Sequence, residues 1–124
     1  MDSPLYDQVG GRAFFERLVD AFYDAVESDA TLRPMYPEDL APSRRHLTLF
    51  LIQYWGGPGE YQAERGHPRL RQRHAPFAVT VAARDAWLRA MTGALDTVGD
   101  ALSDEQHAQL LAYFEMAALQ LRNV

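Results

Sequence analysis

One histidine stands in a short stretch whose side chains could bind a cofactor. The stretch runs from Arg65 to Phe77 and reads RGHPRLRQRHAPF, with His74 two residues before Pro76. Proline lacks a backbone donor and keeps the preceding residue out of the α region, so we expect His74 to end a short helical turn. Neutral imidazole is a good nitrogen ligand for iron and other transition metals. His74 is therefore a candidate metal ligand.

Four arginines share this stretch with His74, in a chain whose net charge is -5. A basic segment in an acidic protein is expected to face an anion, because a guanidinium binds a carboxylate through paired hydrogen bonds. Taken alone, the stretch has an ordinary alternative. Lone histidines usually lie at the surface or are satisfied in the core, and arginine-rich loops are usually solvated.

The composition describes a small globular chain and excludes several kinds of site. Its 124 residues are enough for one domain, which we expect to span 1–124, and 48% of them are hydrophobic. The acidic balance argues against nucleic acid as a partner. The absence of cysteine excludes disulfides, iron–sulfur clusters and thiolate ligands. Without a signal-peptide pattern or an apolar run of ~20 residues, we expect no membrane span and a cytoplasmic protein.

Apolar residues at helical spacing predict four main helices and no strand, which is an all-α fold. The four stripes are Phe15, Leu18, Val19, Phe22, Tyr23 and Val26; Ser43, Leu47, Phe50, Leu51 and Tyr54; Ala83, Trp87, Met91, Ala94, Leu95 and Val98; and His107, Leu110, Leu111, Phe114, Ala117, Ala118 and Leu121. A capping box over 103–106 opens the last helix. Tyr23 and Trp87 fall on buried faces, so their polar atoms need partners in the interior.

Proline and glycine residues predict where these helices break. Pro37 closes a short helical turn over 29–36 and fixes Tyr36 near a corner, because the residue before a proline is extended. The run Gly56-Gly57-Pro58-Gly59 stops the second main helix. From there to about residue 70 we expect a long loop. In a small protein a loop of that length is typically functional.

Several short motifs occur together along residues 6–124. They are the pairs Gly10-Gly11 and Gly56-Gly57, the run Phe22-Tyr23, the corner Tyr36-Pro37-Glu38-Asp39, the run Gln53-Tyr54-Trp55-Gly56-Gly57-Pro58, the stretch from Arg65 to Phe77, and Trp87. A lone glycine pair is common, but this many motifs in order is highly specific. By them the chain resembles the truncated haemoglobins, specifically their second group, over nearly its whole length.

The resemblance implies a two-over-two sandwich of helices around haem b. It assigns His74 to the iron as the proximal ligand and Arg73 to a haem propionate. His46 occupies a position that is commonly Arg or Lys in the family, which makes it a second propionate contact. We assign Phe50 and Phe77 to the cofactor as well. A propionate partner would explain why this acidic chain carries a basic stretch.

On the distal side of the haem, the resemblance places the residues that meet a bound gas. Tyr23, Tyr36 and Trp87 are assigned to line the gas site. Ser43 stands where larger globins usually have a histidine, and Leu47 lies on the same helix beside the cofactor. The side chains of the first three carry a hydroxyl or an indole N–H, so each can donate a hydrogen bond to the gas.

The function implied by the resemblance is reversible binding of O₂ at ferrous iron. Hydrogen bonds from the three donors to the bound gas predict high affinity and slow release. Other diatomic ligands such as CO and NO are expected to bind at the same position. A redox enzyme, with nitric oxide dioxygenase or peroxidase activity, is an alternative. It would need an external reductase, since the chain has no flavin or nicotinamide domain. A third alternative is an all-α interaction module without a cofactor, and a homo-oligomer is compatible with all three.

Overall fold

The computed structural model describes residues 3–69 and 78–123, and it is helical without strands over these residues. In chain order the elements are α1 (Leu5–Gln8), α2 (Arg12–Ser28), η1 (Arg33–Met35), α3 (Ala41–Tyr54), α4 (Glu60–Arg65), α6 (Val81–Thr97), η2 (Gly99–Ala101) and α7 (Asp104–Leu121). The two η elements are short 3-10 turns. The all-α prediction, with four main helices and short accessory turns, is confirmed.

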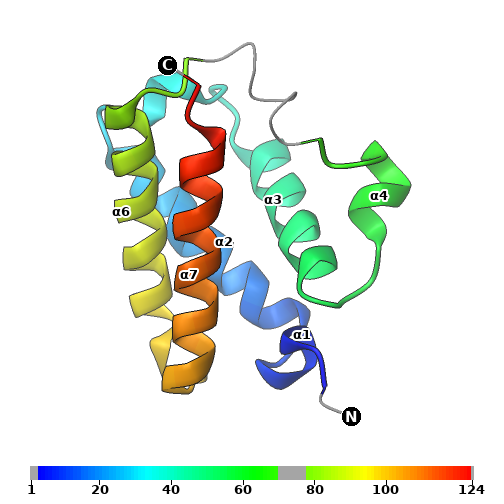
Figure 1. The fold of residues 1–124 in the computed structure, drawn as a ribbon. Coiled ribbons are helices and arrows are strands. Elements are labelled where there is room, and N and C mark those ends of the chain that lie inside the picture. The colour runs from blue at the N-terminus through cyan, green and yellow to red at the C-terminus, as the bar shows by residue number, and fades with distance from the viewer. Residues whose placement is uncertain (1–2, 70–77, 124) are drawn as a thin grey trace.

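The four long helices form two layers. α2 packs against α3 and against α6, and α6 packs against α7. Figure 1 shows α6 and α7 side by side, with α3 and α4 on the other side of the molecule and α2 connecting the two halves. The pair α2–α3 and the pair α6–α7 are the predicted two-over-two sandwich. None of the described helices is both long enough and apolar enough to cross a membrane.

α2 carries the most deeply buried stripe of the core. All six predicted members are buried, namely Phe15, Leu18, Val19, Phe22, Tyr23 and Val26. Full burial of a side chain of this size contributes roughly 1.5–3 kcal/mol to the stability of the folded chain. α2 packs on α3 and on α6, so it joins the two layers. The chain enters α2 through Gly10 and Gly11, whose φ angles are 103° and 73°. That left-handed conformation favours glycine.

The predicted stripe of α3 is wrong at its last member. Tyr54 is 49% exposed, and its ring lies against Tyr113 of α7 with the centroids 4.3 Å apart. The buried part of α3 is instead a continuous run from Thr48 to Ile52. A continuous run is expected of a helix that is covered on more than one side, and a single stripe does not describe it.

The loop predicted after Gly59 is also wrong, because α4 occupies its middle. The glycines lie on either side of α4, with Gly59 before it and Gly66 after it, so they do not prevent a helix between them. The backbone N–H of Gln62 donates to the side-chain oxygen of Gln53 at 2.9 Å, and Tyr61 is 3% exposed. Arg45 of α3 pairs with Glu64. α4 is therefore held by its contacts with α3.

Side-chain caps set the start of the last two helices. The Thr80 hydroxyl accepts from the Ala83 backbone N–H at 3.1 Å at the first turn of α6. At α7 the Ser103 hydroxyl accepts from the Gln106 N–H at 3.1 Å, and the Gln106 side chain accepts from the Ser103 N–H at 3.0 Å. These reciprocal bonds confirm the predicted capping box. Both caps orient helices that line the site described next.

Candidate functional site

A cavity of about 420 Å³ lies among the long helices. Its described walls come from α2, η1, α3, α4, α6 and α7, and most of the side chains are apolar. They include Leu32, Leu47, Leu51, Phe114, Ala118 and Leu121. A concave, largely apolar site of this size with a few polar groups is typical of a bound small molecule or cofactor.

Three hydrogen-bond donors predicted for the distal side lie together in this cavity. Tyr23 comes from α2, Tyr36 from the residue after η1 and Trp87 from α6, and all three line the cavity. The rings of Tyr23 and Tyr36 meet edge to face, with their centroids 5.7 Å apart. Donors from three separate elements thus face one apolar space.

Tyr23 is the most enclosed of the three donors, at 3% exposed. Burial raises the pKa of its phenol well above the ordinary value, and the neighbouring Tyr36 raises it further. A hydrogen bond with the Ser43 side chain and the positive charge of Arg44 act in the opposite direction. Burial is the largest of these influences, so the phenol stays neutral at physiological pH.

Tyr36 and Trp87 present polar atoms with no hydrogen-bond partner among the described residues. Burial raises the pKa of Tyr36 to about 12, so this phenol is neutral as well. Trp87 was predicted to be buried, but it is only half-buried because it lines the cavity. Its ring packs against Phe22 at 5.8 Å and Phe114 at 6.0 Å between centroids. These contacts hold the indole in place at the cavity wall.

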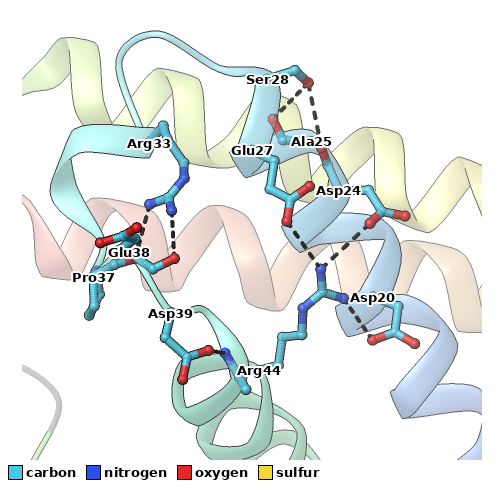
Figure 2. Close-up of polar contacts among 11 residues, drawn as sticks. Asp20, Asp24, Ala25, Glu27, Ser28, Arg33, Pro37, Glu38, Asp39 and Arg44 are labelled. Carbon is cyan, nitrogen blue, oxygen red and sulfur yellow. Dashed lines mark hydrogen bonds and ion pairs between the residues drawn. The ribbon is translucent and has the colours of Figure 1, made fainter.

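The corner that carries Tyr36 is fixed by a single arginine. The Arg33 guanidinium donates to the backbone carbonyl oxygens of Tyr36 at 3.4 Å, Pro37 at 3.0 Å and Glu38 at 2.8 Å. Figure 2 shows the guanidinium reaching the chain at Pro37 and Glu38. The Asp29 carboxylate caps the turn that leads into this corner. The backbone around Tyr36 is therefore tied in place from outside the cavity.

The site residues predicted on α3 also line the cavity. One of the basic groups in the described wall, His46, comes from the same helix. Ser43, His46, Leu47 and Phe50 all belong to the wall. The His46 ring nitrogen Nδ1 lies 2.7 Å from the Arg65 guanidinium. Arg65 and Arg84 line the cavity too, and no acidic residue does so among the described residues. The polarity of this wall suits a ligand that carries carboxylates.

Three predicted site residues lie outside the described residues, namely His74, Arg73 and Phe77. The residues on either side of their segment can still be placed. Arg65, before it, and Val79, after it, both line the cavity. Residues before and after His74 thus line the same space as the three donors.

Sequence reasoning missed several wall residues. Tyr61 belongs to α4, which was expected to be loop, so no helical pattern marked it. Tyr113 lies three residues after Leu110 on α7, and that spacing places it on the buried side. It is 9% exposed and lines the cavity. The i+3 spacing was the signal that could have identified it.

Comparison with known proteins supplies the family. The chain matches the family described as bacterial-like globin over residues 4–120. It is 42% identical to the group 2 truncated hemoglobin YjbI of Bacillus subtilis over 113 residues, which are 91% of this chain and 84% of that protein. The hemoglobin of Chloroflexus aurantiacus superimposes with a TM-score of 0.95 at 46% identity, over 99% of this chain and 100% of the other.

A second solved structure is the truncated oxygen-avid haemoglobin of Bacillus subtilis, with a TM-score of 0.91 and 40% identity over 98% of this chain and 100% of that one. Globins hold haem in an apolar space and bind diatomic gases on it. The apolar cavity and its basic wall residues fit such a flat, propionate-bearing cofactor. This chain belongs to the bacterial-like globin family, and within it to the group II truncated haemoglobins.

Proposed function

We propose that this protein binds O₂ reversibly on haem b, with high affinity and slow release, and that His74 is the iron ligand. CO and NO would bind at the same place. The observation that carries the proposal is the convergence of Tyr23, Tyr36 and Trp87 on one apolar cavity. Haem iron supplies an open coordination position for a diatomic gas. Arg73, His46 and Arg65 are the basic residues that we assign to the propionates, and Phe50, Phe77 and Leu47 to the ring.

The distal residues would slow gas release by donating hydrogen bonds. Tyr36 and Trp87 have donors without partners among the described residues, and the neutral Tyr23 phenol, which also lines the cavity, carries a proton that it can donate. A hydrogen bond to a charged or strongly polarised acceptor contributes ~1.5–3 kcal/mol, which corresponds to about one to two orders of magnitude in a dissociation rate. The apolar wall excludes water that would compete for these donors.

The donor role of Trp87 is tested by replacing it with a ring that cannot donate. In haem-loaded protein, we expect Trp87→Phe to increase the O₂ dissociation rate by roughly tenfold or more, measured by stopped-flow displacement with CO. Trp55→Phe is the matched control, because Trp55 does not line the cavity. An unchanged rate in Trp87→Phe would remove Trp87 from the proposed set of donors.

The ligand role of His74 has a separate test. We expect His74→Gly to lose the Soret spectrum of the natively coordinated haem and to recover it when free imidazole is added, since imidazole can replace the missing side chain. His107→Ala is the control, because His107 pairs with Asp96 and does not line the cavity. Stoichiometric haem with a native spectrum in His74→Gly would contradict the assignment.

A redox activity would use the same site, and kinetic measurements distinguish it from simple gas binding. Such an enzyme must be reduced again after each turnover, and we assign that step to an external reductase in the cytoplasm. The oxygenated protein is mixed rapidly with NO or with peroxide, in the presence of a reductant. Repeated turnover identifies a nitric oxide dioxygenase or a peroxidase. A single stoichiometric reaction without turnover identifies a gas-binding protein.

A further inference from the structure

Arg44 lies outside the cavity, yet it connects α3 to the helix that carries Tyr23. Its guanidinium is 3.0 Å from a carboxylate oxygen of Asp20, 3.6 Å from one of Asp24 and 3.8 Å from one of Glu27, all on α2. The same guanidinium lies over the Tyr23 ring, 5.7 Å from its centroid. Figure 2 shows the three carboxylates around the Arg44 side chain.

The spacing of the three carboxylates explains why they meet one cation. Asp20, Asp24 and Glu27 are four and three residues apart, so they share one face of α2. Like charges at this spacing repel one another, and a guanidinium with five N–H donors can pair with several of them at once. A single exposed ion pair is weak, but the Arg44 side chain is only 28% exposed and makes three. Its position is therefore determined by several contacts together.

Arg44 also follows directly after the hydrogen-bond partner of Tyr23. Ser43 lines the cavity and bonds to the Tyr23 phenol, so the start of α3 must be at the right distance from α2. The ion pairs of Arg44 join the start of α3 to α2 at this point. It contacts the Tyr23 ring through a cation–π interaction and holds the backbone that carries Ser43. In turn the Arg44 carbonyl accepts from the Thr48 hydroxyl at 2.8 Å.

We propose that Arg44 is a positioning residue for Tyr23, whose ring it holds at the cavity wall beside Ser43. Arg44 does not line the cavity, so it would act on a bound gas only through the tyrosine. Its effect on gas release rests on the proposed function, whereas its effect on the ring does not.

The first experiment reads the ring directly, without any gas. The protein is labelled with 3-fluorotyrosine and its ¹⁹F spectrum is recorded with the cofactor bound. The Tyr23 resonance is assigned by its loss in Tyr23→Phe. We expect Arg44→Met to shift and broaden this resonance and Arg44→Lys to shift it less. Arg17→Met is the matched control, because Arg17 is also on the surface of the α2 layer but pairs with Asp100. An unchanged Tyr23 resonance in Arg44→Met would overturn the inference.

The second experiment measures O₂ release by stopped flow. We expect Arg44→Met to accelerate release about two- to fivefold, the factor that corresponds to a cation–π contact of ~0.5–1 kcal/mol. The same change in a Tyr23→Phe background should have no further effect, because the hydroxyl is already absent. Equal acceleration in both backgrounds would mean a general structural role and would overturn the inference. If Tyr23→Phe alone leaves release unchanged while the fluorine signal shifts, only the proposed donor role of Tyr23 fails.

Discussion

Tyr23 and Tyr36 are useful as donors because they keep their protons. A phenolate could only accept, so a pKa within the physiological range would weaken their hold on a gas molecule. Burial excludes this for both residues by raising the pKa of Tyr23 above its ordinary range and that of Tyr36 to about 12. The apolar wall thus maintains the protonation state that the donors require. The indole of Trp87 has no acid–base equilibrium in this range and donates at any pH.

The raised phenol pKa values predict how the stability of the protein depends on pH. In the unfolded chain these tyrosines lose their protons near pH 10, whereas Tyr36 in the folded protein does so at about 12. Between these values the unfolded state binds fewer protons, so the free energy of unfolding falls as pH rises. Each phenol contributes at most about 1.4 kcal/mol per pH unit.

This dependence is measured by urea unfolding between pH 8 and 11.5. We expect a flat profile near pH 8 and a decline above pH 10 in the wild type. Tyr23→Phe and Tyr36→Phe should each make the decline shallower, since each removes one titrating group. Identical slopes in the wild type and both variants would show that the two phenols titrate as they do in the unfolded chain.

At the scale of the elements, the sequence predicts what depends on local pattern. The buried stripe of α2 and the capping box of α7 follow from spacing and from side chains next to the helix end. The course of α4 does not, because the helix is supported by Gln53 and Arg45 of α3, and the sequence does not show that these residues face it. Tyr54 was misplaced for the same reason, since its exposure depends on how Tyr113 of another helix packs.

The sequence predicted the candidate site about as far as it predicted the helices. The motifs identified Tyr23, Tyr36 and Trp87, and the structure places them in one cavity. Arg33 and Arg44 were not identified, because their contacts are with backbone carbonyls and surface carboxylates that spacing alone does not bring together. Residues that hold a site from outside carry no pattern of their own in a single sequence. Their partners appear only in the folded chain.

The glycine run after α3 gives a prediction about the joint between α1 and α3. A Cβ added at Gly57 would lie 2.6 Å from Ile52 Cγ2 and 2.8 Å from two ring carbons of Tyr6. Ile52 is fully buried and cannot move away easily. We therefore expect Gly57→Ala to lower the free energy of unfolding by about 1–3 kcal/mol, measured in urea.

Gly93 provides the matched control for this substitution. It lies within α6, and nothing is within 4 Å of a Cβ added there. Alanine stabilises a helix relative to glycine, so Gly93→Ala should raise the free energy of unfolding by about 0.5–1 kcal/mol. The two glycine-to-alanine changes should thus have opposite signs. A neutral Gly57→Ala would mean that Tyr6 and the α1 turn yield at little cost.

At the scale of the whole molecule, the cavity lies between two parts that differ in how they are packed. α6 packs on both α2 and α7, and α2 carries the buried stripe of the core. α3 packs chiefly on α2 and α4, and its Leu47 and Phe50 side chains face the cavity. Figure 1 shows α3 and α4 together on one side of the molecule. A bound cofactor would fill the space between the two parts and bury apolar surface on both.

This arrangement predicts that cofactor binding stabilises the molecule unevenly. Binding to the folded state alone raises overall stability, and the gain grows with the ratio of ligand concentration to Kd. Local opening should respond most where packing depends on the cavity. In hydrogen exchange followed by mass spectrometry, we expect amides of α3 and α4 to exchange much faster in the protein without haem than in the loaded protein. Amides in the middle of α2 and α6 should change less. Equal protection of all the helices on loading would mean that α3 and α4 are held without the cofactor, and that the cavity wall is already rigid.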